Sequence, residues 1–128
     1  MNVTMMVNKT IPEFADLHVR GEADLVRIEI VARKTVVWSW DFRLPAAVAM
    51  VRCLEGEKEK ARISDMAMSH DHRLIRVKTM DDAPAVWRFL SWDGDNWVHR
   101  FTLGEDDAPA VAWALKAAVV KAMEGGRN

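Results

Sequence analysis

Residues 25–44 read LVRIEIVARKTVVWSWDFRL, and this stretch decides the fold. Apolar and polar side chains alternate on both sides of a tight turn at Arg33 and Lys34, as they do in two half-buried antiparallel strands. The positions that share the buried face are Val26, Ile28, Ile30 and Ala32 in the first strand, and Val36, Trp38, Trp40, Phe42 and Leu44 in the second.

The flanking segments extend this hairpin into a larger unit. Residues 2–8 and 16–21 alternate in the same way and predict two further strands before it. After it, Pro45 suits the first turn of a helix, where its missing N–H is not needed. Ala47, Met50, Val51 and Leu54 then form one apolar helical stripe, and Gly56 is placed to cap the helix. The first half therefore predicts four strands followed by a helix.

The second half follows the same order. Strands are predicted over residues 63–69, 74–80, 85–92 and 97–103, and a helix then runs to about Met123. A shift of 59 residues aligns Ile28 with Trp87, Trp38 with Trp97 and Phe42 with Phe101, which places Trp97 and His99 on the buried face. In the strand at 74–80, Ile75 and Val77 are expected to face inward and Arg76 outward.

We therefore expect one compact α+β domain over residues 1–128. It is built from two β-β-β-β-α repeats, at about 1–60 and 61–128, with antiparallel sheets that are each packed by one helix. The alternative is an unrepeated α+β sheet with both helices on one face. Because identical residues are few in the alignment, the pattern leaves both open.

Composition narrows the class of protein but not its function. Eighteen Lys and Arg oppose nineteen Asp and Glu, so the net charge of −1 gives no overall attraction to nucleic acid or membrane. The single cysteine, Cys53, excludes an internal disulfide and suits a reducing, cytoplasmic compartment. No stretch is typical of a signal peptide or membrane span. Without a catalytic, metal or cofactor motif, we expect a non-enzymatic protein that binds no cofactor.

Charge is nevertheless distributed unevenly over the predicted strands. Positions expected on the outer side are mostly basic, and Trp92 lies among them beside the turn at 93–96. Cations along phosphates and an available ring for base stacking are the chemistry that single-stranded nucleic acid favours. An acidic protein partner and an ordinary solvated sheet face remain alternatives. The candidate binding residues are Arg20, Arg27, Arg33, Arg76, Lys78, Arg88, Trp92 and Arg100.

The last predicted helix is apolar on two sides. Val111, Leu115, Ala118 and Ala122 form the stripe expected to face the core. A second stripe consists of Trp113, Ala117 and Val120. Such a helix is either wedged between two sheets or forms a subunit interface. We favour a homodimer contact, because an exposed apolar stripe would promote aggregation.

The doubled β-β-β-β-α order resembles the plan of Whirly and Pur-type single-stranded nucleic-acid-binding domains. The resemblance covers the whole chain and concerns element order, not a shared motif, so it implies a fold and a class of ligand without transferring residues. Two functions are therefore expected. The first is binding of single-stranded nucleic acid. The second is a small protein-interaction module, such as an inhibitor, an immunity protein or a phage-encoded accessory protein.

Overall fold

The computed structural model describes residues 2–8, 11–57, 60–64, 71–78 and 81–125. Within these residues one antiparallel sheet of eight strands forms, in the order β4-β3-β2-β1-β8-β7-β6-β5. The first half of the chain contains β1 (Asn2–Asn8), β2 (Ile11–Glu22), β3 (Leu25–Ala32), β4 (Thr35–Arg43) and α1 (Leu44–Leu54). The second half of the chain contains β5 (Lys60–Ser64), β6 (Asp71–Val77), β7 (Val86–Trp92), β8 (Trp97–Gly104), the 3₁₀ turn η1 (Glu105–Asp107) and α2 (Ala108–Gly125).

The hairpin of β3 and β4 forms as predicted. In β3, Val26, Ile28, Ile30 and Ala32 are buried while their neighbours are half-exposed. In β4, Trp40 and Phe42 are buried, but Val36 is exposed, because a register shift between Ile30 and Val31 moves it to the other face. The predicted cap of α1 is confirmed. Gly56 has a φ of +92° and donates its backbone N–H to the Cys53 carbonyl at 2.9 Å.

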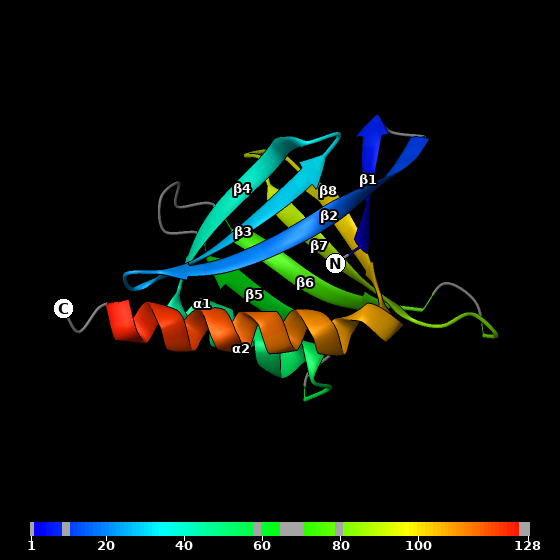
Figure 1. Cartoon of the computed structure of the whole chain (residues 1–128). Coiled ribbons are helices and arrows are strands. Elements are labelled where there is room, and N and C mark those ends of the chain that lie inside the picture. Colours follow the sequence, from blue (N-terminus) through cyan, green and yellow to red (C-terminus); the bar gives the residue numbers. More distant parts are fainter. Residues whose placement is uncertain (1, 9–10, 58–59, 65–70, 79–80, 126–128) are drawn as a thin grey trace.

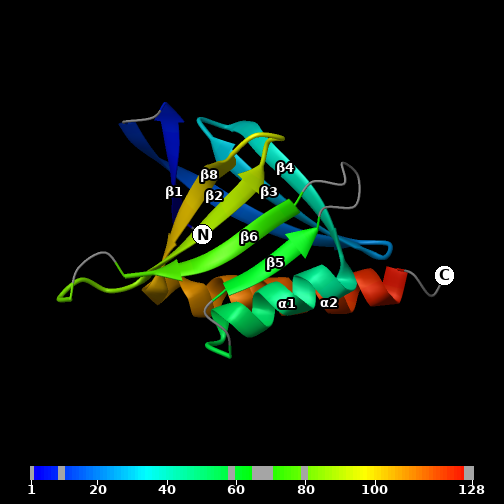
Figure 2. The same cartoon turned by 180° about the vertical axis from the view of Figure 1, so that it is seen from behind.

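The sheet is curled and the two helices lie together along its open side (Figures 1 and 2). α1 connects the edge strands β4 and β5 and contacts both. α2 packs against α1 and, in the first half of the chain, against β2 and β3. The expectation of two sheets, each covered by its own helix, is therefore wrong. A single sheet is continuous through β1 and β8, and the C-terminal helix covers strands of the N-terminal half.

Aromatic side chains fill the inside of the curl. The ring centroids of Trp40 in β4 and Phe89 in β7 are 5.0 Å apart, and Phe89 stacks on Phe101 of β8 with a centroid distance of 4.9 Å. His72 of β6 also belongs to this core and stacks on Phe89 at 5.3 Å. Edge-to-face and offset contacts at these separations are favourable beyond simple burial. The cluster thus joins the edge strand β4 to the three strands that face it across the core.

Two strands of the second half differ from the prediction. β6 begins at Asp71, where a turn was expected, so His72 and Leu74 are buried and Ile75 points outward. Arg76 accordingly lies on the inner side, opposite Trp87. Of the predicted strands 63–69 and 74–80, residues 65–69 and 79–80 lie outside the described residues.

In β8 a bulge reverses the alternation. Phe89 pairs with Phe101, whereas Leu90 pairs with His99, which leaves Arg100 as the extra residue. Phe101 and Leu103 are buried as predicted. Trp97 and His99, however, lie on the outer side with Trp92 and Leu90, and Arg100 points inward. The predicted equivalence of Trp38 and Trp97 is therefore wrong in orientation, and an internal duplication is not confirmed.

Among the described residues no helix combines the length and the apolar character that crossing a membrane requires.

Candidate nucleic-acid interface

The β7–β8 hairpin brings two tryptophans together on the outer side of the sheet. Trp92 and Trp97 are cross-strand partners, and their rings meet edge to face at a centroid distance of 5.4 Å. The turn between them is held by Asp93, whose Oδ1 accepts the backbone N–H groups of Asn96 at 2.7 Å and Asp95 at 2.8 Å. These hydrogen bonds keep the pKa of Asp93 below its usual range. The pair of rings therefore stands on an ordered turn.

A guanidinium group from the next strand covers one of these rings. Arg73 of β6 is exposed, and its Cζ lies 4.2 Å from the ring centroid of Trp97. This separation is within the range of a cation–π interaction. The register explains the encounter, because Arg73 pairs with Leu90 and Leu90 pairs with His99 on the adjacent strand. Three strands thus contribute to one cluster.

The same face continues to a second cation. Arg88 of β7 is half-buried and pairs with Thr102 of β8. His99 lies nearby, and its Nε2 is hydrogen-bonded to the Thr102 Oγ1 at 2.7 Å. Burial, and to a lesser degree the charge of Arg88, lower the pKa of His99. His99 is therefore neutral at pH 7, and the positive charge of this face comes from its two arginines.

We call Arg73, Arg88, Trp92, Trp97 and His99 the aromatic-basic face. Among the described residues, neither Arg73 nor Arg88 forms an ion pair with a carboxylate. Both guanidinium groups are therefore available to an anionic ligand. Arg88 is not fully hydrated, so its attraction for such a ligand is less screened than that of a freely exposed side chain.

One row of cross-strand partners on the outer side runs from β7 through β8 and β1 to β2. Arg88 pairs with Thr102, Thr102 with Thr4 of β1, and Thr4 with Phe14 of β2. The Phe14 side chain is 84% exposed. Three spacings of about 4.8 Å separate the Arg88 and Phe14 strands, or about 14 Å in all. The exposed Phe14 ring thus lies at one end of a row that also contains the two threonines and Arg88.

The arginines predicted in the first half have a different environment. Each is matched with at least one carboxylate. Arg27 contacts Asp41 at 2.7 Å, Arg20 contacts Glu29 at 3.2 Å, and Arg33 contacts Glu13 at 3.0 Å. The hydrogen bond and the charge of Asp41 raise the pKa of Arg27. This half of the outer side is consequently close to neutral.

The other predicted basic residues are dispersed. Arg76 is on the inner side and forms an ion pair with Glu105, while Lys78 is exposed just beyond β6. Arg100 enters the curl, where its Cζ lies 5.4 Å from the Trp38 ring centroid. Of the eight candidate residues, Arg88 and Trp92 share the outer face of β7, whereas Arg20 and Arg27 are cross-strand partners whose guanidinium groups are matched by carboxylates. Sequence reasoning missed Arg73, Trp97 and His99, and correct strand phases would have been needed to find them.

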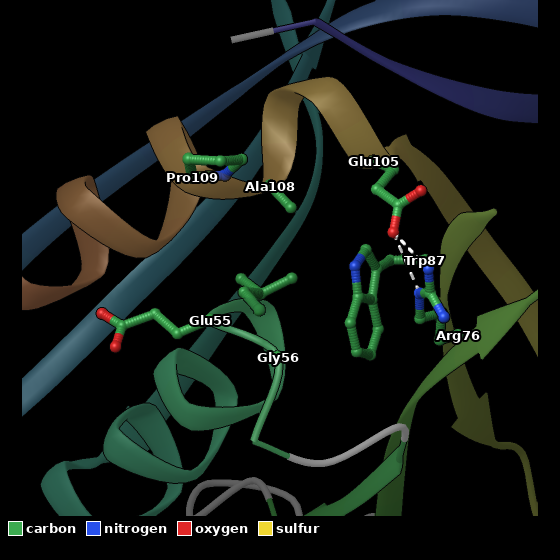
Figure 3. Close-up of a pocket in the computed structure, with 8 residues that line it drawn as sticks. Glu55, Gly56, Arg76, Trp87, Glu105, Ala108 and Pro109 are labelled. Carbon is green, nitrogen blue, oxygen red and sulfur yellow. Dashed lines mark hydrogen bonds and ion pairs between the residues drawn. The ribbon is translucent and has the colours of Figure 1, made fainter. Parts of the chain in front are cut away.

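A separate pocket of about 430 Å³ lies between the end of α1 and the start of α2. Figure 3 shows Trp87 and the Arg76–Glu105 pair on one wall, with Gly56 and Pro109 on others. Arg76 Nε donates to Glu105 Oε1 at 3.1 Å, so the guanidinium is already engaged with a carboxylate. The pocket is on the helical side of the sheet and shares no residue with the aromatic-basic face.

The second apolar stripe of α2, formed by Trp113, Ala117 and Val120 and called the α2 stripe below, is exposed. Trp113 and Val120 are 75% and 55% exposed, whereas the predicted inner stripe of Val111, Leu115, Ala118 and Ala122 is buried. α2 is therefore not wedged between two sheets, and its outer surface is open to a partner.

No protein-family model matches this chain, and no curated protein and no solved structure matches it either. The resemblance to Whirly and Pur-type domains accordingly rests on the order of strands and helices alone.

Proposed function

We propose that this protein binds single-stranded nucleic acid, without catalysing a reaction, through the aromatic-basic face. The observation that carries the proposal is the Arg73 guanidinium stacked over Trp97, with Trp92 in edge-to-face contact beside it. Aromatic rings give unpaired bases a surface for stacking, and arginines contact the phosphates between them. Bases in a duplex are already stacked on one another, so this combination favours single strands.

The distribution of charge supports the same ligand. The whole chain has a net charge of −1, so attraction to a polyanion has to be local. Among the described residues, the two arginines of the aromatic-basic face have no carboxylate partner and provide this local attraction, whereas Arg20, Arg27 and Arg33 of the first half are paired. The Phe14 ring extends the available surface across β8 and β1.

The first experiment measures affinity for a fluorescent oligothymidylate by anisotropy, from about 50 to about 200 mM salt. Arg73→Glu with Arg88→Glu should reduce affinity and lower the salt slope by about 1.4, the value for two phosphate contacts on a single strand. Trp97→Ala should cost roughly 1–3 kcal/mol of binding energy, about 5- to 150-fold in affinity.

The matched control is Arg33→Glu with Arg52→Glu. It changes the net charge by the same amount, but both residues are exposed and lie away from the aromatic-basic face. The control should lower affinity only slightly. An equal loss in both double variants would mean that binding depends on net charge alone, and an unchanged affinity in the first would exclude this face.

An acidic protein segment is the competing ligand for the same face. It would use the two arginines but would not need exposed rings to stack bases. Retained affinity for an acidic peptide, together with no affinity for any oligonucleotide, would favour this ligand over nucleic acid.

A protein-interaction module of the inhibitor or immunity type is the second candidate. The observation that favours it is the exposed α2 stripe, together with Met123, which is 45% exposed. This candidate predicts a partner that the Trp113→Ala variant loses and that Arg73→Glu with Arg88→Glu retains. The opposite pattern of loss would contradict it. We keep a cytoplasmic location as part of both proposals, because the one cysteine, Cys53, is buried and unsuited to a disulfide.

A further inference from the structure

The outer side of α2 alternates large and small residues in a way that is complementary to itself. Its exposed positions include Ala110, Trp113, Ala117 and Val120, two small and two large side chains at helical spacing. In a two-fold contact between identical helices, residue i meets j and residue j meets i. An antiparallel pair centred between Trp113 and Ala117 places each Trp113 on the other copy's Ala117 and each Val120 on its Ala110. Among these four residues, each large side chain then faces a small one.

Charges along the helix favour the same orientation. Asp106 and Asp107 are exposed before the first turn, and Lys121 is exposed near the last turns. Among the described residues none of the three forms an ion pair, whereas Lys116 is paired with Glu55. In the antiparallel register Lys121 faces position 109, about 3 Å along the axis from Asp107. Glu124 falls opposite Asp106, and these two carboxylates repel each other. The attraction in this register therefore comes from Lys121 and Asp107. A parallel pair would instead bring like ends together.

We infer that a second copy of this chain binds along α2 in antiparallel orientation, with the α2 stripe at the centre of a two-fold dimer. This inference goes beyond the proposed function and uses a different surface. An 18-residue helix is about 27 Å long, so the contact is at the small end of specific interfaces. The dimer therefore dissociates on dilution.

Sedimentation velocity over a wide concentration range tests the inference. The native chain should pass from monomer to dimer as concentration rises, and Trp113→Asp should remain monomeric at every concentration. Phe14→Asp is the matched control, because it removes an equally exposed ring from β2 and should leave the dimer intact. A native chain that stays monomeric, or a Trp113→Asp variant that dimerises, would overturn the inference.

Two further variants separate this geometry from unspecific association. Ala117→Trp adds apolar surface but removes the small residue that receives Trp113, so it should weaken the dimer, and a strengthened one would contradict the register. Lys121→Glu should also weaken it, and adding Asp106→Lys and Asp107→Lys should restore it. Circular dichroism confirms that each variant is folded. Oligonucleotide binding by the monomeric Trp113→Asp chain is scored separately, so that either proposal can fail alone.

Discussion

His99 shows how the environment of a single residue defines the chemistry of the aromatic-basic face. Its ring is half-buried, hydrogen-bonded to Thr102 and close to Arg88. Burial and the charge of Arg88 favour the neutral imidazole and outweigh the Phe101 backbone, so the pKa of His99 is lowered. The folded state therefore resists a proton that the unfolded chain accepts.

This asymmetry predicts a pH dependence of stability. Above the unfolded histidine pKa of about 6.5 both states are neutral at His99, and the residue contributes no slope. As the pH falls below that value, the unfolded state gains the proton first, so the free energy of unfolding decreases until the lower folded-state pKa is passed. Urea unfolding at several pH values should show a shallower decrease for His99→Gln than for the native chain. Parallel curves would mean that the pKa of His99 is not lowered on folding.

The arginines of the first half show what residue-level reading from sequence misses. The sequence identified Arg20, Arg27 and Arg33 as outward-facing; Arg20 and Arg27 do lie on the outer side, and Arg33 is exposed in the turn between β3 and β4. It could not identify their partners. Arg27 meets Asp41 only because of the β3–β4 register, which includes a shift that no glycine or proline marks. Whether an arginine meets a carboxylate on the neighbouring strand depends on the strand register, and the register depends on tertiary packing.

At the level of elements, the backbones of β2 and α2 approach each other closely at Gly21. A Cβ on Gly21 would overlap the Ala118 carbonyl oxygen and lie 2.9 Å from its carbonyl carbon. The backbone N–H of Asp24 also donates to the Ala122 carbonyl at 3.3 Å. Glycine at this position thus lets the C-terminal helix rest directly on a strand of the N-terminal half.

Gly21→Ala should therefore destabilise the protein. The methyl group meets rigid backbone instead of a movable side chain, and overpacking of this kind costs about 1–3 kcal/mol. Gly104→Ala is the control in another strand, because its nearest neighbour would be the Asp107 carboxylate oxygen at 3.7 Å, an ordinary contact. The shift of the thermal midpoint should be large for the first variant and small for the second. Equal midpoints would place α2 farther from β2 than described.

The sequence predicted which segments form strands and helices more reliably than which of their side chains face the core. The strands β3 and β4, the inner stripe of α2 and the Gly56 cap were all predictable, because alternation, helical spacing and glycine signals are local. β6 was misphased since a buried histidine is unusual. His72 is accommodated because its Nδ1 is hydrogen-bonded to the Ser91 Oγ at 2.8 Å. The β8 bulge at Arg100 has no local signal, yet it decides which face carries Trp97.

At the scale of the whole molecule, the two halves depend on each other. The rings of β4 pack against those of β7 and β8, and α2 crosses to the strands of the first half. Neither arrangement is encoded in a local pattern, since each half alone is compatible with its own sheet and helix. The sequence therefore predicted an α+β antiparallel domain correctly and left a single sheet with both helices on one face as the alternative, but it did not predict the packing of α2 against β2 and β3.

The six tryptophans report on separate parts of this molecule. Trp92 and Trp97 lie on the aromatic-basic face, Trp113 on the α2 stripe, and Trp87 beside the pocket. Trp40 is buried in the core, and Trp38 lies half-exposed next to Arg100. Each indole N–H gives its own signal in a proton–nitrogen correlation spectrum, so one spectrum can locate a ligand on the fold.

Adding an oligothymidylate to the labelled protein and following these indole signals tests the central claim most directly. We predict progressive shifts of the Trp92 and Trp97 signals, with those of Trp87 and Trp113 unchanged. Shifts at Trp113 or Trp87, with Trp92 and Trp97 unaffected, would place the ligand on α2 or in the pocket and would contradict binding by the aromatic-basic face. The absence of any shift at saturating oligonucleotide would contradict the proposed function itself.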